Sequence, residues 1–593
     1  MAAALSSSFL TSTPILLSHN LPSINSSTRA RVQAAAAPPH HHHRSLTSLA
    51  LTAADDFINT VIDPPGPHCP STDPASVLSG NFSPVDELPP TECHVIHGSL
   101  PPCLDGSYIR NGPNPQFHPS GPYHLFDGDG MLHALTISRA RPPTLCSRYV
   151  ETYKYLTEKA AGAPLVPNVF SAFNRLPAAV ARAVLTAVRV ALGQFNPAKG
   201  IGLANTNLAF FGGRLFALGE SDLPYAVRLT EDGDVETIGR HDFDGRLGVS
   251  MTAHPKIDLQ TGETFAFRYG PRSPCLTYFR FDADGRKQAD VPILSFSRKT
   301  PFLHDFAITK KYAMFVDTQI VMDPVDWAFR GGSLIRSDPN KMPRVGVIPR
   351  YATDGSEMKW FDVAGFNPVH AINAWDEEDG DGLVMLVSNV ICVEDALESL
   401  ELVQARVEKL RIDLKTGTVN RVPVSTRNLD FGVVNPGYVG RTNRFIYAGV
   451  GDPMPKISGV VKLDVGDDEM GRTEEERTVA CRMFGPGCFA GEPFFVAKDP
   501  ENPEAEEDEG YVVTYVHDEI KGESRFLVMD AQSPELEIVA AVRLPRRVPY
   551  GFHGLFVRES DLRDGKLTDQ VKDHILCNFH SNSNEVKLES SVK

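Results

Sequence analysis

The 593-residue chain contains 58 Lys and Arg residues and 74 Asp and Glu residues, which gives a formal net charge of −16. This charge argues against a general affinity for polyanions, so we expect no nucleic-acid partner. The nine cysteines are odd in number and include no C-x-x-C pair, which makes a poor disulfide framework and a poor zinc-ribbon pattern. This cysteine usage favours a reducing compartment.

Residues 1–54 contain three arginines and no acidic residue, together with many Ser, Thr, Ala and Leu residues. This composition is typical of an organelle transit peptide. A secretory signal is the alternative, but the apolar stretch 9–17 is interrupted by Ser, Thr and Pro and follows no basic residue. We therefore predict an import peptide over 1–54 and a flexible linker over 55–80. We expect the histidine run at 40–43 to take no part in a metal site.

From about residue 80 the sequence consists of short apolar or alternating runs separated by Gly, Asp, Asn and Pro, a pattern that indicates many β-strands. DADGR at 282–286 and LKTGT at 414–418 each place a glycine where a tight turn needs a positive φ. The sequence contains no uninterrupted apolar span of 18 residues, so we predict no transmembrane helix. A propeller or a large barrel would remove exposed sheet edges at this length. The clearest predicted strands are 214–218, 263–269, 276–281, 312–316, 382–390, 444–450, 510–516 and 525–530.

One helix is predicted at about 174–195, within a segment (160–219) that has no acidic residue. Its arginines recur every seven residues and so share one face, which suits a membrane surface. The alternative is a helix packed on the β-core with its arginines in water. The candidate membrane contacts are Arg175, Arg182, Val184, Val188 and Arg189.

Four histidines stand in strand-like or turn-like sequence: His254 in TAHPKID, His304 in FLHDF, His370 in NPVHAINAW and His553 in YGFHG. No local motif such as H-E-x-x-H joins them, so their spacing alone is weak evidence for a metal site. Any one of the nineteen histidines is more often a surface or hydrogen-bonded core residue. The spacing does permit histidines from successive sheet modules to converge on the axis of a radial all-β fold.

The segments around these histidines resemble the carotenoid cleavage dioxygenases, most closely the fourth class of plant enzymes in that family. The resemblance covers about residues 82–562 and includes RNGPNPQF at 110–117, YHLFDGDGMLHA at 123–134, HDFAITKKYAMF at 304–315, GEPFFV at 491–496 and VPYGFHGLF at 548–556. It implies an all-β, seven-bladed β-propeller over 81–562, capped by loops and a few helices. Residues 563–593 lie beyond it, and we predict no structure for this tail.

The resemblance also implies an Fe²⁺ ion on the axis, bound by His254, His304, His370 and His553. It places Glu220, Glu492 and Asp430 behind these ligands. A carboxylate in that position accepts the ring N–H of a ligand histidine, which fixes the tautomer and aims the other nitrogen at the metal. Relatives usually have Glu where this chain has Asp430, so the shorter side chain leaves open whether the third contact forms.

The implied reaction is the cleavage of one carotenoid or apocarotenoid double bond by O₂ to give two carbonyl products. Four imidazoles leave two positions of an octahedral ion for O₂ or water, and we expect no separate catalytic acid or base. Class resemblance favours the 9,10 (9',10') bond and ionone-type products. The alternatives are 9-cis-epoxycarotenoid cleavage for abscisic acid synthesis and an inactive propeller scaffold. The resemblance further implies a plastid location, in chloroplasts or on plastoglobules, with peripheral lipid contact.

Overall fold

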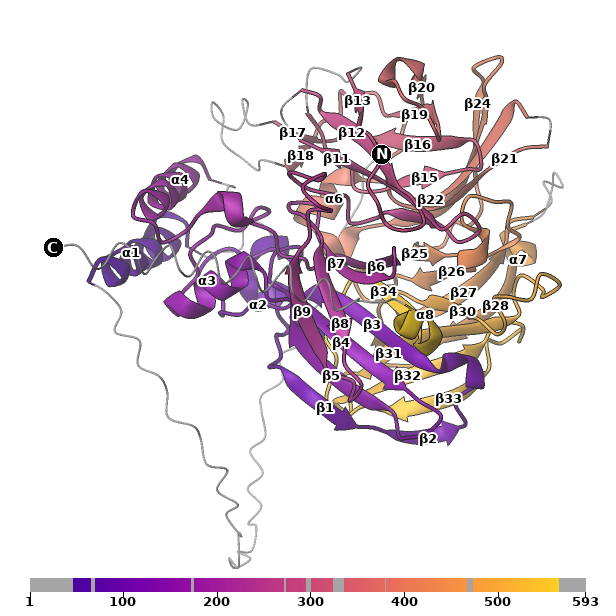
Figure 1. Cartoon of the computed structure of the whole chain (residues 1–593), viewed down its shortest axis with the longest axis horizontal. Helices are drawn as coiled ribbons and strands as arrows, with labels where there is room; N and C mark the ends of the chain where they lie inside the picture. Colours follow the sequence, from indigo (N-terminus) through magenta and orange to yellow (C-terminus); the bar gives the residue numbers. More distant parts are fainter. Residues whose placement is uncertain are drawn as a thin grey trace, which may run out of the picture. The chain divides into compact units, whose positions relative to one another are not determined.

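The computed structural model of the protein describes residues 46–64, 70–171, 175–270, 273–294, 300–323, 335–378, 380–466 and 473–564. Most of the predicted import peptide and nearly all of the predicted tail lie outside these ranges. Within them, short strands dominate the chain, and several helices gather on one side of the strands (Figure 1). No helix of the described part is both long enough and apolar enough to span a membrane.

Five sheets contain four strands each and are built from strands that lie near one another in the chain. Their strands are β6 (Asn207–Phe211), β7 (Arg214–Leu218), β8 (Tyr225–Leu229) and β9 (Val235–Arg240); β10 (Lys256–Asp258), β11 (Glu263–Tyr269), β12 (Leu276–Phe281) and β13 (Val291–Ile293); β15 (Phe306–Ile308), β16 (Tyr312–Asp317), β19 (Arg344–Pro349) and β20 (Lys359–Asp362); β21 (Pro368–Asp376), β22 (Gly382–Val390), β23 (Ala405–Asp413) and β24 (Val419–Pro423); and β25 (Leu429–Val433), β26 (Phe445–Val450), β27 (Gly459–Asp464) and β28 (Thr478–Met483). Neighbouring strands run antiparallel, as in the nine-residue pairing of β22 with β23.

Two larger sheets combine early and late strands. One contains β1 (Leu88–Glu92), β5 (Thr144–Tyr149), β4 (Gly130–Ile137), β3 (Gly106–Pro113) and β34 (Gly554–Arg558) in that order. The other contains β2 (His94–Gly98), β33 (Ile538–Arg543), β32 (Glu523–Asp530), β31 (Gly510–Asp518) and β29 (Cys488–Ala490), with β30 (Phe494–Ala497) also paired to β31. A small sheet contains β14 (Thr300–Pro301), β17 (Ile320–Met322) and β18 (Ile335–Ser337). The β3–β34 and β2–β33 pairings tie the two ends of the described chain together.

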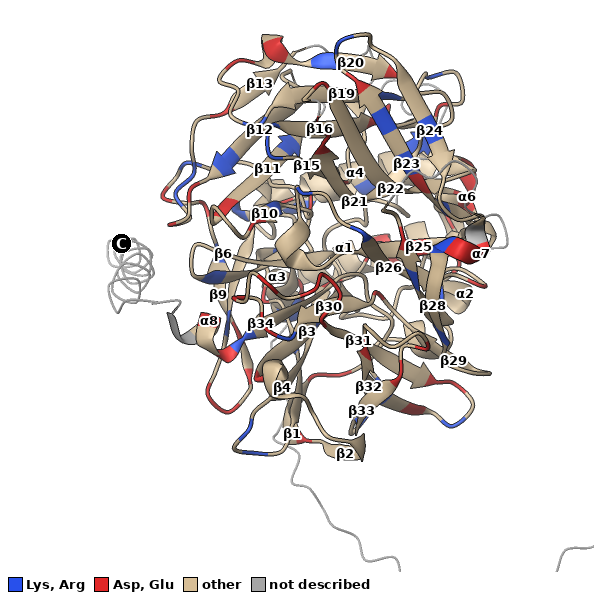
Figure 2. Ribbon diagram, turned by 90° about the vertical axis from the view of Figure 1, so that its right-hand side faces the viewer, with Lys and Arg blue, Asp and Glu red and all other residues tan. Residues whose placement is uncertain are grey.

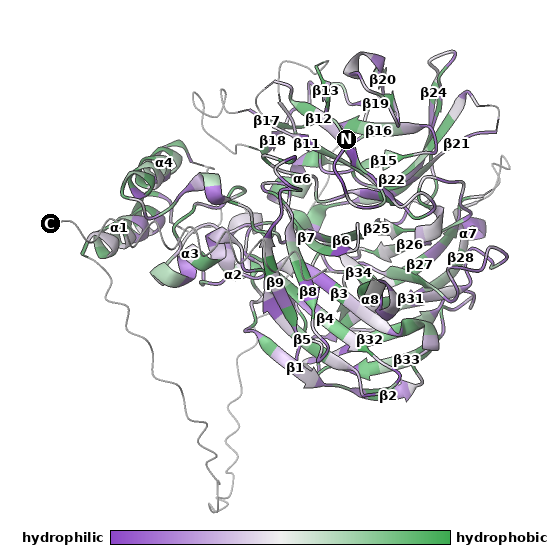
Figure 3. Cartoon of the chain, in the orientation of Figure 1, coloured by the Kyte–Doolittle hydropathy of each residue, from purple (hydrophilic) through white to green (hydrophobic). Residues whose placement is uncertain are grey.

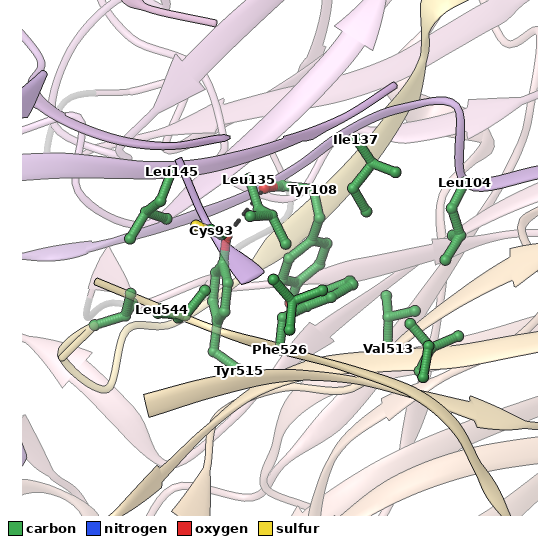
Figure 4. Close-up of a cluster of buried hydrophobic side chains, with 14 of the residues drawn as sticks. Cys93, Leu104, Tyr108, Leu135, Ile137, Leu145, Val513, Tyr515, Phe526 and Leu544 are labelled. Atoms are coloured by element: carbon green, nitrogen blue, oxygen red, sulfur yellow. Dashed lines mark hydrogen bonds between the residues drawn. The ribbon is translucent and has the colours of Figure 1, made fainter. Parts of the chain in front are cut away.

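An apolar cluster fills the space between these two larger sheets. Leu135 and Leu145 from β4 and β5 lie across from Val513 and Phe526 of β31 and β32 (Figure 4). All four are fully buried, and burial of such side chains stabilises a fold by about 1.5–3 kcal/mol each. The sheets therefore pack face to face through apolar contact. Each described sheet keeps open edges and none closes on itself, so the described strands do not form one large barrel.

The strand predictions agree with the structure to within two residues at each end. Five of the predicted runs became β7, β11, β12, β16 and β22, because alternating and buried apolar residues fit the two-residue period of a strand. Gly285 and Gly417, in the two predicted turns, have φ of +77° and +75°. An all-β fold is confirmed. Lys and Arg residues are interspersed with Asp and Glu residues over its strands and loops (Figure 2).

The α-helices within the described residues are α1 (Leu46–Phe57), α2 (Pro74–Val77), α3 (Tyr153–Ala161), α4 (Leu176–Ala191), α6 (Val393–Glu398), α7 (Glu474–Arg477) and α8 (Glu559–Asp564). Helix α4 confirms the helix predicted at about 174–195. Largely apolar helices α1 and α4 lie side by side (Figure 3), with Ala178 and Leu185 of α4 packed on Ile58.

The prediction of a flexible linker over 55–80 is wrong for its described residues, since α2 also lies within it. Residues 55–57 end α1, and Ile58–Ile62 continue it as one π-helical turn. These turns carry carboxylates that pair with arginines of α4, so they belong to a packed helical unit. Part of the segment assigned to the import peptide, 46–54, also lies in this helix.

The predicted direction of Arg182 and Arg189 is wrong. Arg182 and Arg189 are only 6% and 2% exposed, and their guanidinium groups lie 2.7 Å from the carboxylates of Asp63 and Asp55. A guanidinium this deeply buried requires a charged partner, so these side chains cannot face a membrane or water. Val184 and Val188 lie on the outer side of α4, with Val184 59% exposed.

Candidate metal centre

Each of the four predicted ligands lies at the beginning of a strand. His254 and His304 precede β10 and β15 by two residues, His370 is the third residue of β21, and His553 directly precedes β34. β10, β15 and β21 are edge strands, each the first of its own four-stranded sheet. The chain thus brings four histidines from four sheets to one place.

The four imidazoles converge closely enough to share one ion. One ring nitrogen from each can be chosen such that all four lie within 4.8 Å of one another. The Nε2 atoms of His254 and His304 are 3.0 Å apart. Two cis ligands bound about 2.1 Å from one ion would be separated by about 3.0 Å, so this spacing fits a metal. His254 and His553 are buried, and His304 and His370 are half-buried.

The three predicted carboxylates contact three of the ligands. The Nδ1–H of His370 donates to Asp430 Oδ1 and that of His553 donates to Glu492 Oε1, each over 2.9 Å. His304 Nδ1 makes a short hydrogen bond to Glu220 Oε1. With Nδ1 protonated and bound in this way, each Nε2 keeps its lone pair for a metal.

The shorter Asp430 reaches His370 because the backbone at this point is irregular. The pairing of β25 with β26 shifts register between Asp430 and Val433, and Phe431 has φ +53°. A β-bulge re-aims the side chains of its strand. The bulge therefore brings a carboxylate within reach without the extra methylene of Glu.

Sequence reasoning missed two groups that hold these carboxylates. The Tyr269 hydroxyl donates to Glu220 Oε2 over 2.6 Å, and the Gly554 N–H donates to Glu492 Oε2 over 2.8 Å. Gly554 directly follows a ligand in the sequence, which is a usable signal. Tyr269 is the last residue of a predicted strand 35 residues before His304, and nothing local marks it.

His254 is supported differently. Its Nδ1 lies 4.0 Å from Asp305 Oδ2, which is too far for a direct hydrogen bond. Among the described residues, its ring has no hydrogen-bonded carboxylate. Asp305, which sequence reasoning also missed, directly follows the ligand His304 in the chain.

Comparisons with known proteins identify the family of this chain. The family model described as retinal pigment epithelial membrane protein matches residues 81–558. The chain belongs to the carotenoid oxygenase family. It is 66% identical over 521 residues to "Probable carotenoid cleavage dioxygenase 4, chloroplastic" of Arabidopsis thaliana. This match covers 87% of this chain and 86% of the Arabidopsis protein.

Two further relatives of this carotenoid oxygenase are informative. The chain is 60% identical over 525 residues to "9-cis-epoxycarotenoid dioxygenase NCED1, chloroplastic" of Oryza sativa subsp. japonica, covering 88% of this chain and 81% of that one. A crystal structure of cobalt-substituted apocarotenoid oxygenase from Synechocystis is also similar, with a TM-score of 0.65 and 26% identity. The match covers 82% of this chain and 99% of the Synechocystis chain. The chain is therefore an enzyme that belongs to the carotenoid cleavage dioxygenases.

The protonation of two imidazoles in this oxygenase, those of His254 and His553, suits metal binding. Burial, together with the neighbouring imidazoles, holds the pKa of His254 well below its ordinary value. Burial also lowers the pKa of His553, against the attraction of Glu492. At His370 burial acts in the same direction, but Asp430 outweighs it and the pKa is raised. A metal binds the neutral imidazole, which is the form that the lowered pKa values of His254 and His553 favour.

One aromatic ring, that of Phe431, lies against two of the histidines, and three further rings contact one another in series from Tyr269. The Phe431 ring lies 5.4 Å from the His370 ring and 5.8 Å from the His553 ring, centroid to centroid. Tyr269 contacts Phe302 at 5.9 Å, and Phe302 contacts Phe170 at 6.4 Å. Phe431 therefore places apolar surface beside His370 and His553.

Proposed function

We propose that this chain is an Fe²⁺-dependent dioxygenase that cleaves a double bond of a carotenoid or apocarotenoid. The observation that carries the proposal is the convergence of four histidines, three of them aimed by buried or half-buried carboxylates. An all-imidazole donor set suits a divalent first-row transition ion, and it leaves the positive charge of the ion uncompensated by ligands.

The residues of this chain would act by positioning. When bound, Fe²⁺ would supply the activation of O₂ beside an electron-rich double bond. Glu220, Asp430 and Glu492 hold the imidazole tautomers, and rings such as Phe431 and Phe302 offer apolar contact to a polyene and keep water away from it. No side chain is assigned a proton-transfer step, because cleavage to two carbonyls with both oxygen atoms of O₂ needs none.

The cleaved bond is proposed as 9,10 (9',10'), on the class resemblance around the histidines. The main alternative is 9-cis-epoxycarotenoid cleavage, which the rice relative's name specifies for that protein. Incubation of iron-loaded protein with β-carotene, an apocarotenal and a 9-cis-epoxycarotenoid, followed by mass analysis of both products, separates the two. Ionone-type C13 ketones support the proposal, and cleavage of the epoxycarotenoid alone contradicts it. An inactive scaffold would give no product and no bound iron.

We also propose that the seven described sheets of four or more strands are the blades of a propeller whose axis passes through the histidines. Support comes from ligands at the starts of strands in four of these sheets and from the joining of early and late strands in two of them. An experimental structure with a different number of blades would contradict this arrangement.

We propose that the enzyme works in chloroplasts and touches plastid lipid, plastoglobules included. The composition of residues 1–54 and the chloroplastic relatives support the location. The lipid-facing surface would be the apolar outer side of α4, including Val180, Val184 and Leu192, in place of its arginines. A fluorescent fusion of residues 1–54 that stays in the cytosol would contradict the import step.

A further inference from the structure

The ion pair between Lys256 and Asp305 joins the segments that carry two of the candidate ligands. Lys256 Nζ lies 2.8 Å from Asp305 Oδ1, and the Asp305 side chain is buried. Lys256 begins β10, two residues after His254, and Asp305 directly follows His304. These segments lead into two different sheets.

The same pair binds a third ligand segment through its backbone. The Ala371 N–H donates to Asp305 Oδ2 over 2.8 Å, and the Ala371 carbonyl accepts from Lys256 Nζ over 3.3 Å. Ala371 directly follows His370 and lies between two irregularities in the pairing of β21 with β22. Asp305 Oδ1 also accepts the N–H of Phe306 over 2.7 Å, which fixes the carboxylate on its own chain segment.

The value of such a pair lies in its geometry. Removing two charges from water costs several kcal/mol per ion, so a buried ion pair contributes little net stability compared with apolar side chains of similar size. Its hydrogen bonds are directional, however, and metal-binding groups must be held to within about 0.5 Å of the productive geometry. His254 depends on its backbone most, since its ring has no hydrogen-bonded carboxylate among the described residues.

We propose that the Lys256–Asp305 pair is a positioning element of the metal centre, which sets the separation of His254, His304 and His370. The inference rests on the proposed metal-dependent function. The pair acts through the ligand segments: Asp305 holds the backbone next to His370, and Lys256 holds Asp305. Neither side chain is assigned a contact with metal or substrate.

The test is a Co²⁺ titration of the purified chain, with affinity measured by chelator competition and geometry by the visible spectrum. Lys256→Met, Asp305→Asn and the double variant should each bind Co²⁺ about 10- to 100-fold more weakly, the usual cost of losing groups that orient metal ligands, with an altered spectrum. The double variant leaves no unpaired buried charge, so it keeps the test valid where a single variant does not fold.

Asp258→Asn is the matched control. Asp258 lies in the same strand β10 and forms another buried ion pair, 2.6 Å from Arg350 Nη2. This variant should lower the melting temperature and leave the Co²⁺ affinity and spectrum unchanged. Equal Co²⁺ affinity in the wild type and the double variant overturns the inference, as does an equal loss in Asp258→Asn. A wild type that binds no Co²⁺ refutes the metal-dependent function itself, and the inference with it.

Discussion

At the metal centre, single carboxylates decide which nitrogen of each imidazole is free. Asp430 is instructive because its side chain is one methylene shorter than the Glu expected from relatives, yet its Oδ1 lies 2.9 Å from His370 Nδ1. The bulge of β25 and the positive φ of Phe431 bring the Asp430 carboxylate close enough to His370 to make up for its shorter side chain. A non-Gly residue in this conformation costs about 1–3 kcal/mol, which the surrounding structure must offset.

We expect Asp430→Asn to weaken metal binding by about 10- to 100-fold, because the amide keeps the shape but loses the charge that attracts the His370 N–H. Asp430→Glu should also weaken it, since an added methylene at this backbone position would displace the carboxylate from its 2.9 Å contact with His370. Iron content after dialysis against a weak chelator measures both. Asp284→Asn, in an exposed turn, is the control and should retain full iron. Wild-type affinity in Asp430→Asn would show that this hydrogen bond is dispensable.

At the scale of elements, helix α4 marks the limit of sequence reasoning. A seven-residue spacing correctly places Arg175, Arg182 and Arg189 on one side of the helix. It does not tell which way that side faces, because the answer depends on partners elsewhere in the chain. Those partners, Asp55 and Asp63, lie more than a hundred residues upstream.

Deletion of α1 tests this pairing. A chain that starts at Leu46 keeps both carboxylates and is the reference. A chain that starts at Pro64 lacks Asp55 and Asp63 and leaves two buried arginines without their carboxylates. Loss of one partner of a buried pair costs about 3–5 kcal/mol, so this chain should melt at a lower temperature or lose α4. Equal melting curves for the two chains would mean that the pairing does not stabilise the helical unit.

Lipid contact should depend on the outer valines of α4. We expect the Val184→Ser, Val188→Ser double variant to reduce co-sedimentation with neutral phospholipid vesicles at least tenfold, because each buried valine contributes about 1.5–3 kcal/mol. Anionic lipid or added salt should have little effect, since Arg182 and Arg189 are already paired inside the protein. Val422→Ser, at an exposed position of β24, is the control. Binding that requires anionic lipid would contradict the apolar mode of contact.

For the whole molecule, the strands were predictable and the assembly of the site was not. The alternating run 263–269 and the largely continuous apolar run 382–390 are each a local strand signal, and they match β11 and β22. Successive histidines of the four are 50, 66 and 183 residues apart, and only resemblance to a family grouped them. The groups missed, Tyr269 and Asp305, act on ligands through tertiary contacts that no local pattern encodes.

Because the ligands come from four sheets, a bound metal should stabilise the whole protein. An ion that binds only the folded state adds about 2.7 kcal/mol when its free concentration is 100 times its Kd. We therefore expect chelation of the purified enzyme to lower its melting temperature and added Fe²⁺ or Co²⁺ to restore it. His370→Ala should abolish this response, whereas His94→Ala, on the exposed strand β2, should keep it. A melting temperature indifferent to metal would mean that the histidines are held together by the fold alone, and that the centre contributes nothing to joining the sheets.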